Sequence, residues 1–279
     1  FRDAVIRAFN DDLPFDTFVR YQVGGPMEDE LKRDRYVELR QFMHLGTRLQ
    51  NNSDPNDKQF HRLDDMVSTT GTAFLGLTFG CARCHDHPVD PMSTEEYYRV
   101  AAFYFDQVRE APKASARKIE LRVKEPRVLL KGSWRSPGKS VEPGFLQVLM
   151  KKDDHYWRAG SGSKLEALGQ WLTDHEDGAG QLLARVIVNR LWHHHFGQGL
   201  VSSPNDFGNL GSPPSHPGLL DYLARTLIEG GWQLKNIQRM IVTSATYRQS
   251  SSAETAFLEK DAENTLLWHR RPHRLEAEA

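Results

Sequence analysis

The spacing of apolar residues predicts helices along most of this chain. Apolar side chains recur at intervals of three and four residues, which places them on one face of a helix. The segments with this spacing are residues 15–23, 31–49, about 60–79, 97–105, 182–196, 219–228 and 234–241. Gly24, Gly197 and Gly230 follow three of these segments and predict where those helices end.

The middle of the chain changes to the two-residue alternation that is typical of a strand. Ile119, Leu121 and Val123 alternate with charged residues, and Val128-Leu129-Leu130 follows as a second strand that would pair with the first. Gly, Pro and Ser cluster at residues 132–144 and 160–163, as in linkers. We therefore predict a mainly α protein with a small β-containing segment between two helical parts. The predicted domains are 1–110 (helical), 111–163 (β-containing linker) and 164–279 (helical).

The charge balance gives no reason to expect nucleic acid or an anionic membrane as a partner. Lys and Arg number 36 and Asp and Glu number 37, so the formal net charge is −1. The longest apolar run, residues 73–79, is far too short to cross a bilayer, so we predict no transmembrane segment. The chain starts at Phe1 and both ends look cut, so we expect any signal peptide to lie outside these residues.

The two cysteines of the chain fall in one motif, Cys81-Ala82-Arg83-Cys84-His85. In a c-type cytochrome, two cysteines in this spacing form thioether bonds to a haem, and the histidine that follows binds its iron. We therefore predict a covalent haem c held by Cys81 and Cys84, with His85 as the proximal iron ligand. Prolines at 88 and 91 and a Ser-x-x-Glu capping box at 93–96 predict that the motif is a loop between two helices.

The same residues allow other interpretations. Cys81, Cys84, His85 and His87 are four ligands that zinc or another divalent metal accepts, although ligands so close in sequence rarely reach one tetrahedral ion without strain. A Cys-x-x-Cys motif can also be a redox dithiol or a local disulfide, but the dithiol is expected in a βαβ context. The sixth haem ligand stays open among Met43, Met66, Met92, His44, His61 and the histidines of the second half.

A run of three histidines, His193, His194 and His195, is the second conspicuous feature. Successive helical residues are turned by about 100°, so the three imidazoles cannot all face one metal, and at most two would converge, with help from Asp206 or His216. The simpler interpretation is that histidines in a last helical turn bond free carbonyls and interact with the helix dipole. The sequence shows no phosphate-binding loop, no His-Glu-x-x-His and no Gly-x-Ser-x-Gly.

Two groups of motifs resemble a known family. Phe74-Leu75-Gly76-Leu77-Thr78, the stretch from Cys81 to Pro91 and Tyr97-Tyr98 look like the planctomycete cytochrome-type domain DUF1549 (PSCyt2). Residues 185–192, 194–197, 199–201, 206–208, 215–217, 231–232 and 243–251 look like its usual partner domain, DUF1553 (PSD1). The chain departs from the first domain at Gln22-Val23-Gly24-Gly25-Pro26, where the family usually reads Gln-x-Ala-Gly-Asp.

This resemblance implies an exported protein of Planctomycetes or related bacteria. Together with the motif, it predicts a periplasmic or otherwise extracytoplasmic haem protein with an electron-transfer or redox role and an unknown redox partner. The alternative is a metal-dependent hydrolase, or a protein associated with a surface polysaccharide system, that uses a Cys/His metal site. The sequence does not assign a role to the histidine run.

Overall fold

The structure of this chain, a computed structural model, describes residues 1–46, 54–108, 123–252 and 255–272. The fold is mainly α, as predicted, and the described residues form one small antiparallel sheet of two strands. The elements are α1 (Arg2–Asn10), α2 (Phe15–Gln22), α3 (Glu30–Tyr36), η1 (Val37–His44), α4 (Pro55–Thr70), η2 (Gly71–Leu75), η3 (Gly80–Arg83), α5 (Thr94–Val108), β1 (Arg127–Leu129), η4 (Leu130–Gly132), β2 (Pro137–Ser140), η5 (Gln147–Leu149), α6 (Asp154–Ala159), α7 (Lys164–Thr173), α8 (Gly180–Phe196), α9 (Pro217–Glu229), α10 (Leu234–Thr243) and α11 (Thr255–Leu258).

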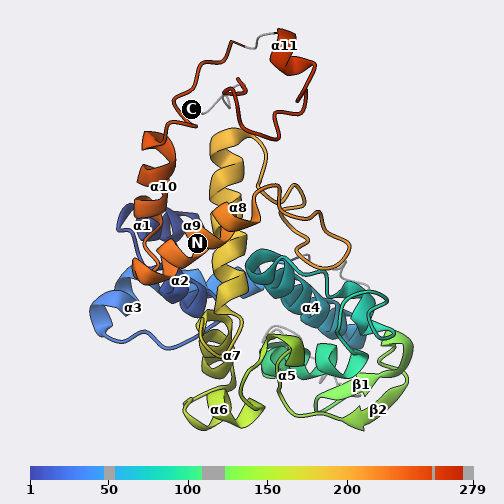
Figure 1. The fold of residues 1–279 in the computed structure, drawn as a ribbon. Coiled ribbons are helices and arrows are strands. Elements are labelled where there is room, and N and C mark those ends of the chain that lie inside the picture. Colours follow the sequence, from blue (N-terminus) through green and yellow to red (C-terminus); the bar gives the residue numbers. More distant parts are fainter. Residues whose placement is uncertain (47–53, 109–122, 253–254, 273–279) are drawn as a thin grey trace.

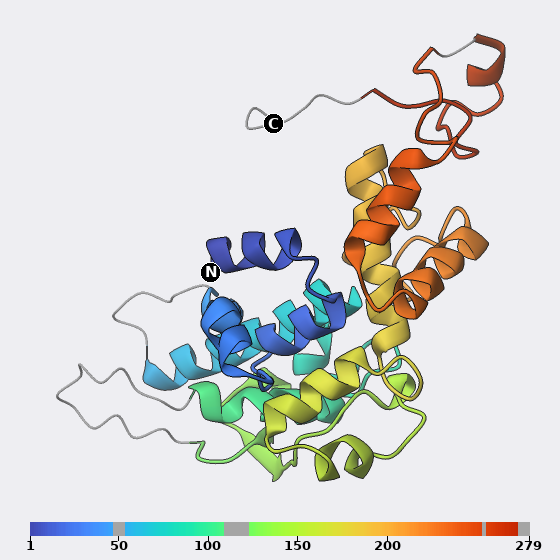
Figure 2. The same cartoon turned by 90° about the vertical axis from the view of Figure 1, so that its left-hand side faces the viewer.

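The long helix α8 connects two groups of elements. Helices α2, α4, α5 and α7 gather at one end of the molecule together with the β1–β2 hairpin (Figure 1). Helices α9 and α10 pack against α8 and against each other, and Figure 2 shows this group standing beside the first. Helix α8 ends at Gly197, as predicted, where the backbone N–H of Gly197 donates to the carbonyl of His193.

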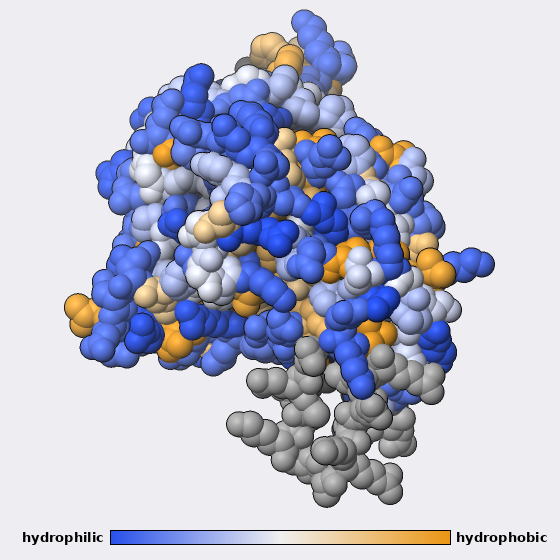
Figure 3. All heavy atoms as spheres, turned by 90° about the horizontal axis from the view of Figure 1, so that it is seen from below, coloured by the Kyte–Doolittle hydropathy of each residue, from blue (hydrophilic) through white to orange (hydrophobic). Residues whose placement is uncertain are grey.

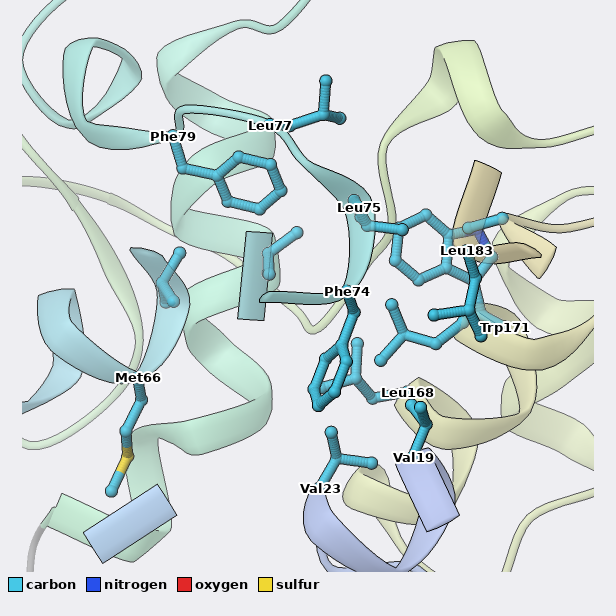
Figure 4. Close-up of a cluster of buried hydrophobic side chains, with 14 of the residues drawn as sticks. Val19, Val23, Met66, Phe74, Leu75, Leu77, Phe79, Leu168, Trp171 and Leu183 are labelled. Atoms are coloured by element: carbon cyan, nitrogen blue, oxygen red, sulfur yellow. The ribbon is translucent and has the colours of Figure 1, made fainter. Parts of the chain in front are cut away.

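The segment that leads into the cysteine motif is anchored in the core. Phe74 and Leu75 are buried and lie among side chains of α2, α7 and α8, including Val19, Leu168 and Leu183 (Figure 4). Four tryptophans are buried as well: Trp157, Trp171, Trp192 and Trp232. The motif therefore begins from a fixed point, because the chain just before it cannot move without opening this core.

Residues 31–46 do not form the single helix that their spacing predicts. Helix α3 ends at Tyr36, and the chain continues in the tighter turns of η1. The guanidinium of Arg7 donates to the carbonyl of Arg35 at 3.2 Å, and the Tyr36 hydroxyl donates to Asp11 at 2.6 Å. These contacts with α1 and its end hold the backbone where an α-helix would otherwise continue. The predicted end of this helix, at residues 47–49, lies outside the described residues.

The helix predicted over residues 60–79 also ends early. Helix α4 stops at Thr70 and widens into the π-turn η2, and Gly76 then leaves the helix with φ of +59°. The cause is tertiary, because the guanidinium of Arg190 on α8 donates to the carbonyls of Thr72 and Ala73. Such wide turns often mark places where a side chain takes over backbone hydrogen bonds.

Strand β1 pairs with a strand that the sequence pattern did not predict. Strand β1 contains Val128 and Leu129, as predicted, but it pairs with β2. Of the strand predicted at 118–124, residues 118–122 lie outside the described residues, and Val123 and Lys124 belong to no strand. The loop between β1 and β2 is short, so pairing them closes a small loop and costs little chain entropy.

Exposed apolar side chains occur in small separate groups on the mostly hydrophilic face seen in Figure 3. Within the described residues, every helix is too short or too polar to cross a bilayer.

Candidate functional site

The cysteine motif forms a short exposed turn at the surface. Cys81 lies in η3 and Cys84 directly follows it. Both thiols are free and both residues are exposed, whereas Ala82 between them is fully buried. The turn therefore uses Ala82 as its apolar anchor and presents both sulfurs to solvent.

The imidazole of His85 is held in one orientation by its neighbour. His85 is exposed, and its Nδ1 lies 2.7 Å from the backbone carbonyl oxygen of Asp86. A carbonyl oxygen only accepts, so Nδ1 must carry the hydrogen, which leaves the lone pair of neutral His85 on Nε2. The carboxylate of Asp86 in turn accepts from the backbone N–H of Thr94 at 2.8 Å, which ties this residue to the start of α5. Histidines that bind a metal commonly donate their other ring N–H to a backbone carbonyl in this way.

Two tyrosines of α5 and an aspartate of α4 hold the cysteine turn in place through hydrogen bonds and an ion pair. The Tyr98 hydroxyl donates to the carbonyl of Arg83 at 2.9 Å. The Arg83 guanidinium pairs with Asp64 at 3.0 Å, and the Tyr97 hydroxyl donates to the other oxygen of Asp64 at 2.6 Å. Sequence reasoning singled out the tyrosines only as family motif residues and missed Asp64, which is far from the motif in sequence.

Burial and charge shape the ionisation of this support. Burial raises the pKa of both Tyr97 and Tyr98 above the usual value, so both hydroxyls stay protonated and can donate at neutral pH. Burial alone would lower the pKa of Arg83, but Asp64 and the neighbouring tyrosines outweigh it and raise that pKa. Arg83 is therefore a fixed positive charge inside the motif.

The β1–β2 hairpin contacts the motif through a glycine. Gly132 has φ of +69°, and a Cβ placed on it would lie 2.8 Å from Cys84 Sγ and 3.3 Å from Arg83 Nε. Any other residue would collide with the Cys84 thiol. The hairpin thus forms a close wall beside one of the two sulfurs, which the sequence pattern could not reveal.

These residues fit the chemistry of a c-type haem. Attachment of this haem requires two free thiols and one imidazole with an available nitrogen, and the turn presents all three at the surface. Two hollows in the described part of the chain, of about 210 and 520 Å³, are lined by other residues. A haem bound at this turn would therefore lie outside both hollows.

His87 does not join the other three residues of the alternative metal set. Its side chain is 1% exposed, and its Nδ1 accepts from the backbone N–H of Asp90 at 2.9 Å. No three His, Cys, Asp or Glu side chains are grouped to hold a metal ion anywhere in the described residues. His87 instead shapes the loop after the motif, with its own backbone N–H donating to Met92 at 2.8 Å.

The histidine run lies in the last turn of α8, and its hydrogen bonding is that of a helix end. His195 Nδ1 donates to the carbonyl of Leu191 at 2.7 Å, one turn earlier in α8. His193 and His194 have their rings at a right angle, and neither belongs to a group of side chains that could hold a metal ion among the described residues. Asp206 and His216 are occupied locally, by the backbone of Gly208 and by Ser215. His216 is the N-cap residue of α9, and no side chain caps this helix.

The candidate sixth ligands fall into two groups. Met43, Met66 and Met92 are buried in the core, whereas His44 and His61 are exposed. A buried methionine is available to a haem only if the core opens, so exposure favours the two histidines over the three methionines.

Many of the remaining motif residues join the first helical part to the second. Arg190, within the family motif at residues 185–192, reaches from α8 to two carbonyls of η2. The backbone N–H of Phe207 donates to the carbonyl of Gly76 at 2.7 Å. The backbone N–H of Asn209 donates to the buried carboxylate of Asp90 at 2.7 Å. These contacts form a seam that connects the loop after the cysteine motif to the second half.

Comparison with protein families agrees with this division into two parts. Residues 1–110 match the family model described as PSCyt2, protein of unknown function (DUF1549), and residues 165–279 match PSD1, protein of unknown function (DUF1553). The first part of the chain is therefore similar to DUF1549 and the second part to DUF1553. No curated protein and no solved structure matches the chain. The cysteine motif lies in the first matched region, and the seam brings residues of both matched regions together.

Proposed function

We propose that this chain is an extracytoplasmic c-type haem protein with an electron-transfer or redox role. The observation that carries the proposal is the arrangement at the motif. Two free, exposed thiols flank a buried alanine, and His85 is oriented by Asp86 so that its Nε2 is available. When bound, the haem supplies reversible one-electron chemistry at its iron.

The roles of the three residues follow from their chemistry. Cys81 and Cys84 would hold the haem through thioether bonds to its two vinyl groups. Each bond would form by addition of the thiol, with the hydrogen going to the other vinyl carbon, so attachment would need no oxidant. His85 would hold the iron through Nε2, and the bond from its Nδ1–H to Asp86 would increase the basicity of the ring.

The geometry favours a haem over a bare metal ion. A tetrahedral zinc site needs several protein ligands that converge on one point, and His87 is turned away and hydrogen-bonded inside the loop. A haem needs only His85 from the motif on its iron, because the two sulfurs bind carbon. The alternative of a metal-dependent hydrolase, or of a polysaccharide-associated protein that uses such a metal, has no supporting arrangement among the described residues.

The test is to produce the chain behind an export signal in a host with haem-ligation machinery. We expect protein purified under denaturing conditions to keep its colour and to show the sharp absorption bands of a reduced c-type haem. The variant Cys81→Ala/Cys84→Ala should lose the covalent colour, while Cys81→Ser and Cys84→Ser alone should each retain one thioether. As a matched control, Ser133→Ala changes a polar residue of the hairpin and should leave attachment intact.

Metal analysis separates the proposal from its alternatives. One iron per chain with covalent haem supports it, whereas zinc without iron would support the metal-site alternative. Two titratable thiols, or a disulfide, in protein that binds neither metal nor haem in the equipped host would overturn the proposal.

A further inference from the structure

Arg83 lies between the two attachment cysteines, yet its side chain is turned inward. The side chain is 27% exposed, and its guanidinium pairs with Asp64 on α4, whose side chain is exposed to the same extent. The backbone carbonyl of Arg83 is fixed separately by the Tyr98 hydroxyl. Both ends of this residue are therefore held by buried elements.

Asp64 is held as firmly as Arg83. One carboxylate oxygen accepts from Arg83 at 3.0 Å and the other from the hydroxyl of Tyr97 at 2.6 Å. Tyr97 is 2% exposed, so the hydroxyl comes from a side chain that is itself locked in the core. A paired charge of this kind has a defined position, unlike a surface ion pair with free side chains.

The positive member of the pair lies close to one attachment sulfur. Arg83 Nε and Cys84 Sγ both lie near one point, the place where a Cβ on Gly132 would be, at 3.3 and 2.8 Å. A group bonded to Cys84 Sγ would therefore lie close in space to the fixed guanidinium of Arg83. In a half-buried site, charges at such separations act on each other more strongly than in water.

We propose that Arg83 and Asp64 form a charge pair that sets the reduction potential of the haem at Cys81 and Cys84, a proposal that rests on the proposed function. The oxidised iron carries one more positive charge than the reduced iron. Arg83 disfavours the oxidised form, and Asp64 offsets this effect. Tyr97 and Tyr98 are positioning residues that hold the pair in place.

The experiment is a charge cycle on the haem-loaded chain, read as the midpoint potential in a redox titration. Asp64→Asn keeps the side-chain size and an oxygen that accepts from Tyr97, but it leaves Arg83 uncompensated, so the midpoint should rise. Arg83→Gln removes the positive charge, so the midpoint should fall. Each change should alter the ratio of reduced to oxidised protein at a fixed potential by at least about threefold. The double variant should return close to the parent.

The opposite signs distinguish charge from structural damage, because a loosened site would move both single variants in the same direction. Glu38→Gln is the matched control, since it breaks the Arg7–Glu38 pair at 3.1 Å, of similar exposure and on other elements. It should leave the midpoint unchanged. If Arg83→Gln attaches no haem, Arg83→Lys, which keeps the charge, should lie close to the parent while Asp64→Asn still rises.

The inference is overturned if both single variants shift in one direction, or if neither shifts more than Glu38→Gln. Either result leaves haem attachment itself intact, so the proposed function survives it. Absence of covalent haem from the parent chain refutes the proposed function, and the charge-pair proposal with it.

Discussion

Replacing Gly132 by alanine tests the contact between the hairpin and the cysteine motif. Two costs add at this position. The left-handed backbone, with φ of +69°, disfavours alanine by about 1–2 kcal/mol. The new Cβ would lie 2.8 Å from Cys84 Sγ, and relieving such an overlap in a packed site costs roughly 1–3 kcal/mol. We therefore expect Gly132→Ala to lower the free energy of unfolding by roughly 2–5 kcal/mol.

Gly231 provides the matched control for this substitution. It has φ of +70°, and a Cβ placed on it would meet no atom within 4 Å. Gly231→Ala should therefore show the backbone cost alone, about 1–2 kcal/mol in urea unfolding. The variant Cys84→Ala should remove much of the extra cost of Gly132→Ala, because the sulfur that collides is gone. Equal costs for Gly132→Ala and Gly231→Ala, or no relief by Cys84→Ala, would refute the reasoning.

Two further substitutions test the rest of the fold. Asn189 is fully buried and bonds both the N–H and the carbonyl of Val201, at 2.8 and 3.0 Å, so Asn189→Ala should cost about 2–4 kcal/mol in urea unfolding, against less than about 0.5 for the exposed Asn236→Ala. Hydrogen bonds from Arg35 and Tyr36 lower the pKa of Asp11 from 3.8 to about 2. This carboxylate therefore stabilises the fold above pH 3.8 and loses that effect as the pH falls towards 2. The difference in melting temperature between the parent and Asp11→Asn should be present at a pH of about 5 and vanish at a pH of about 2. A difference that stays the same across this pH range would contradict the reasoning.

Local signals predicted the elements whose ends are set by local chemistry. Helix α8 ends at Gly197, and the capping box before α5 is formed by Ser93 and Glu96, each bonding the other's backbone N–H. Apolar spacing also placed α9 and α10 correctly, because one face of each packs on α8.

The predicted helix ends that were wrong are those that a side chain distant in sequence determines. Arg7 takes the carbonyl of Arg35 and Arg190 takes those of Thr72 and Ala73, so two predicted helices end early. No sequence pattern near Arg35 or Thr72 indicates that Arg7 or Arg190 would donate to the carbonyls there. Strand β2 was missed for a different, local reason, since a short strand of Pro, Gly, Lys and Ser shows no alternation of apolar and polar residues.

The residues of the candidate site also divide into those that the sequence predicts and those that it does not. The three residues of the motif are readable because haem attachment fixes their types and spacing. Asp64 lies 17 residues before the motif in the sequence, and Gly132 lies well after it. Both contact the motif only in the folded chain, so no local sequence pattern identifies them. The family motifs, in turn, contribute largely to the seam, where Phe207 and Asn209 bind the first part through backbone groups.

Peptide mass spectrometry of exported protein is the most direct test of the central claim. A protease cuts the purified chain, and the peptide that contains Cys81, Cys84 and His85 is weighed. The account predicts that this peptide carries the added mass of one haem through both cysteines, and that no other peptide does. Recovery of the same peptide at its unmodified mass, from a host that loads a known c-type cytochrome in parallel, would contradict it.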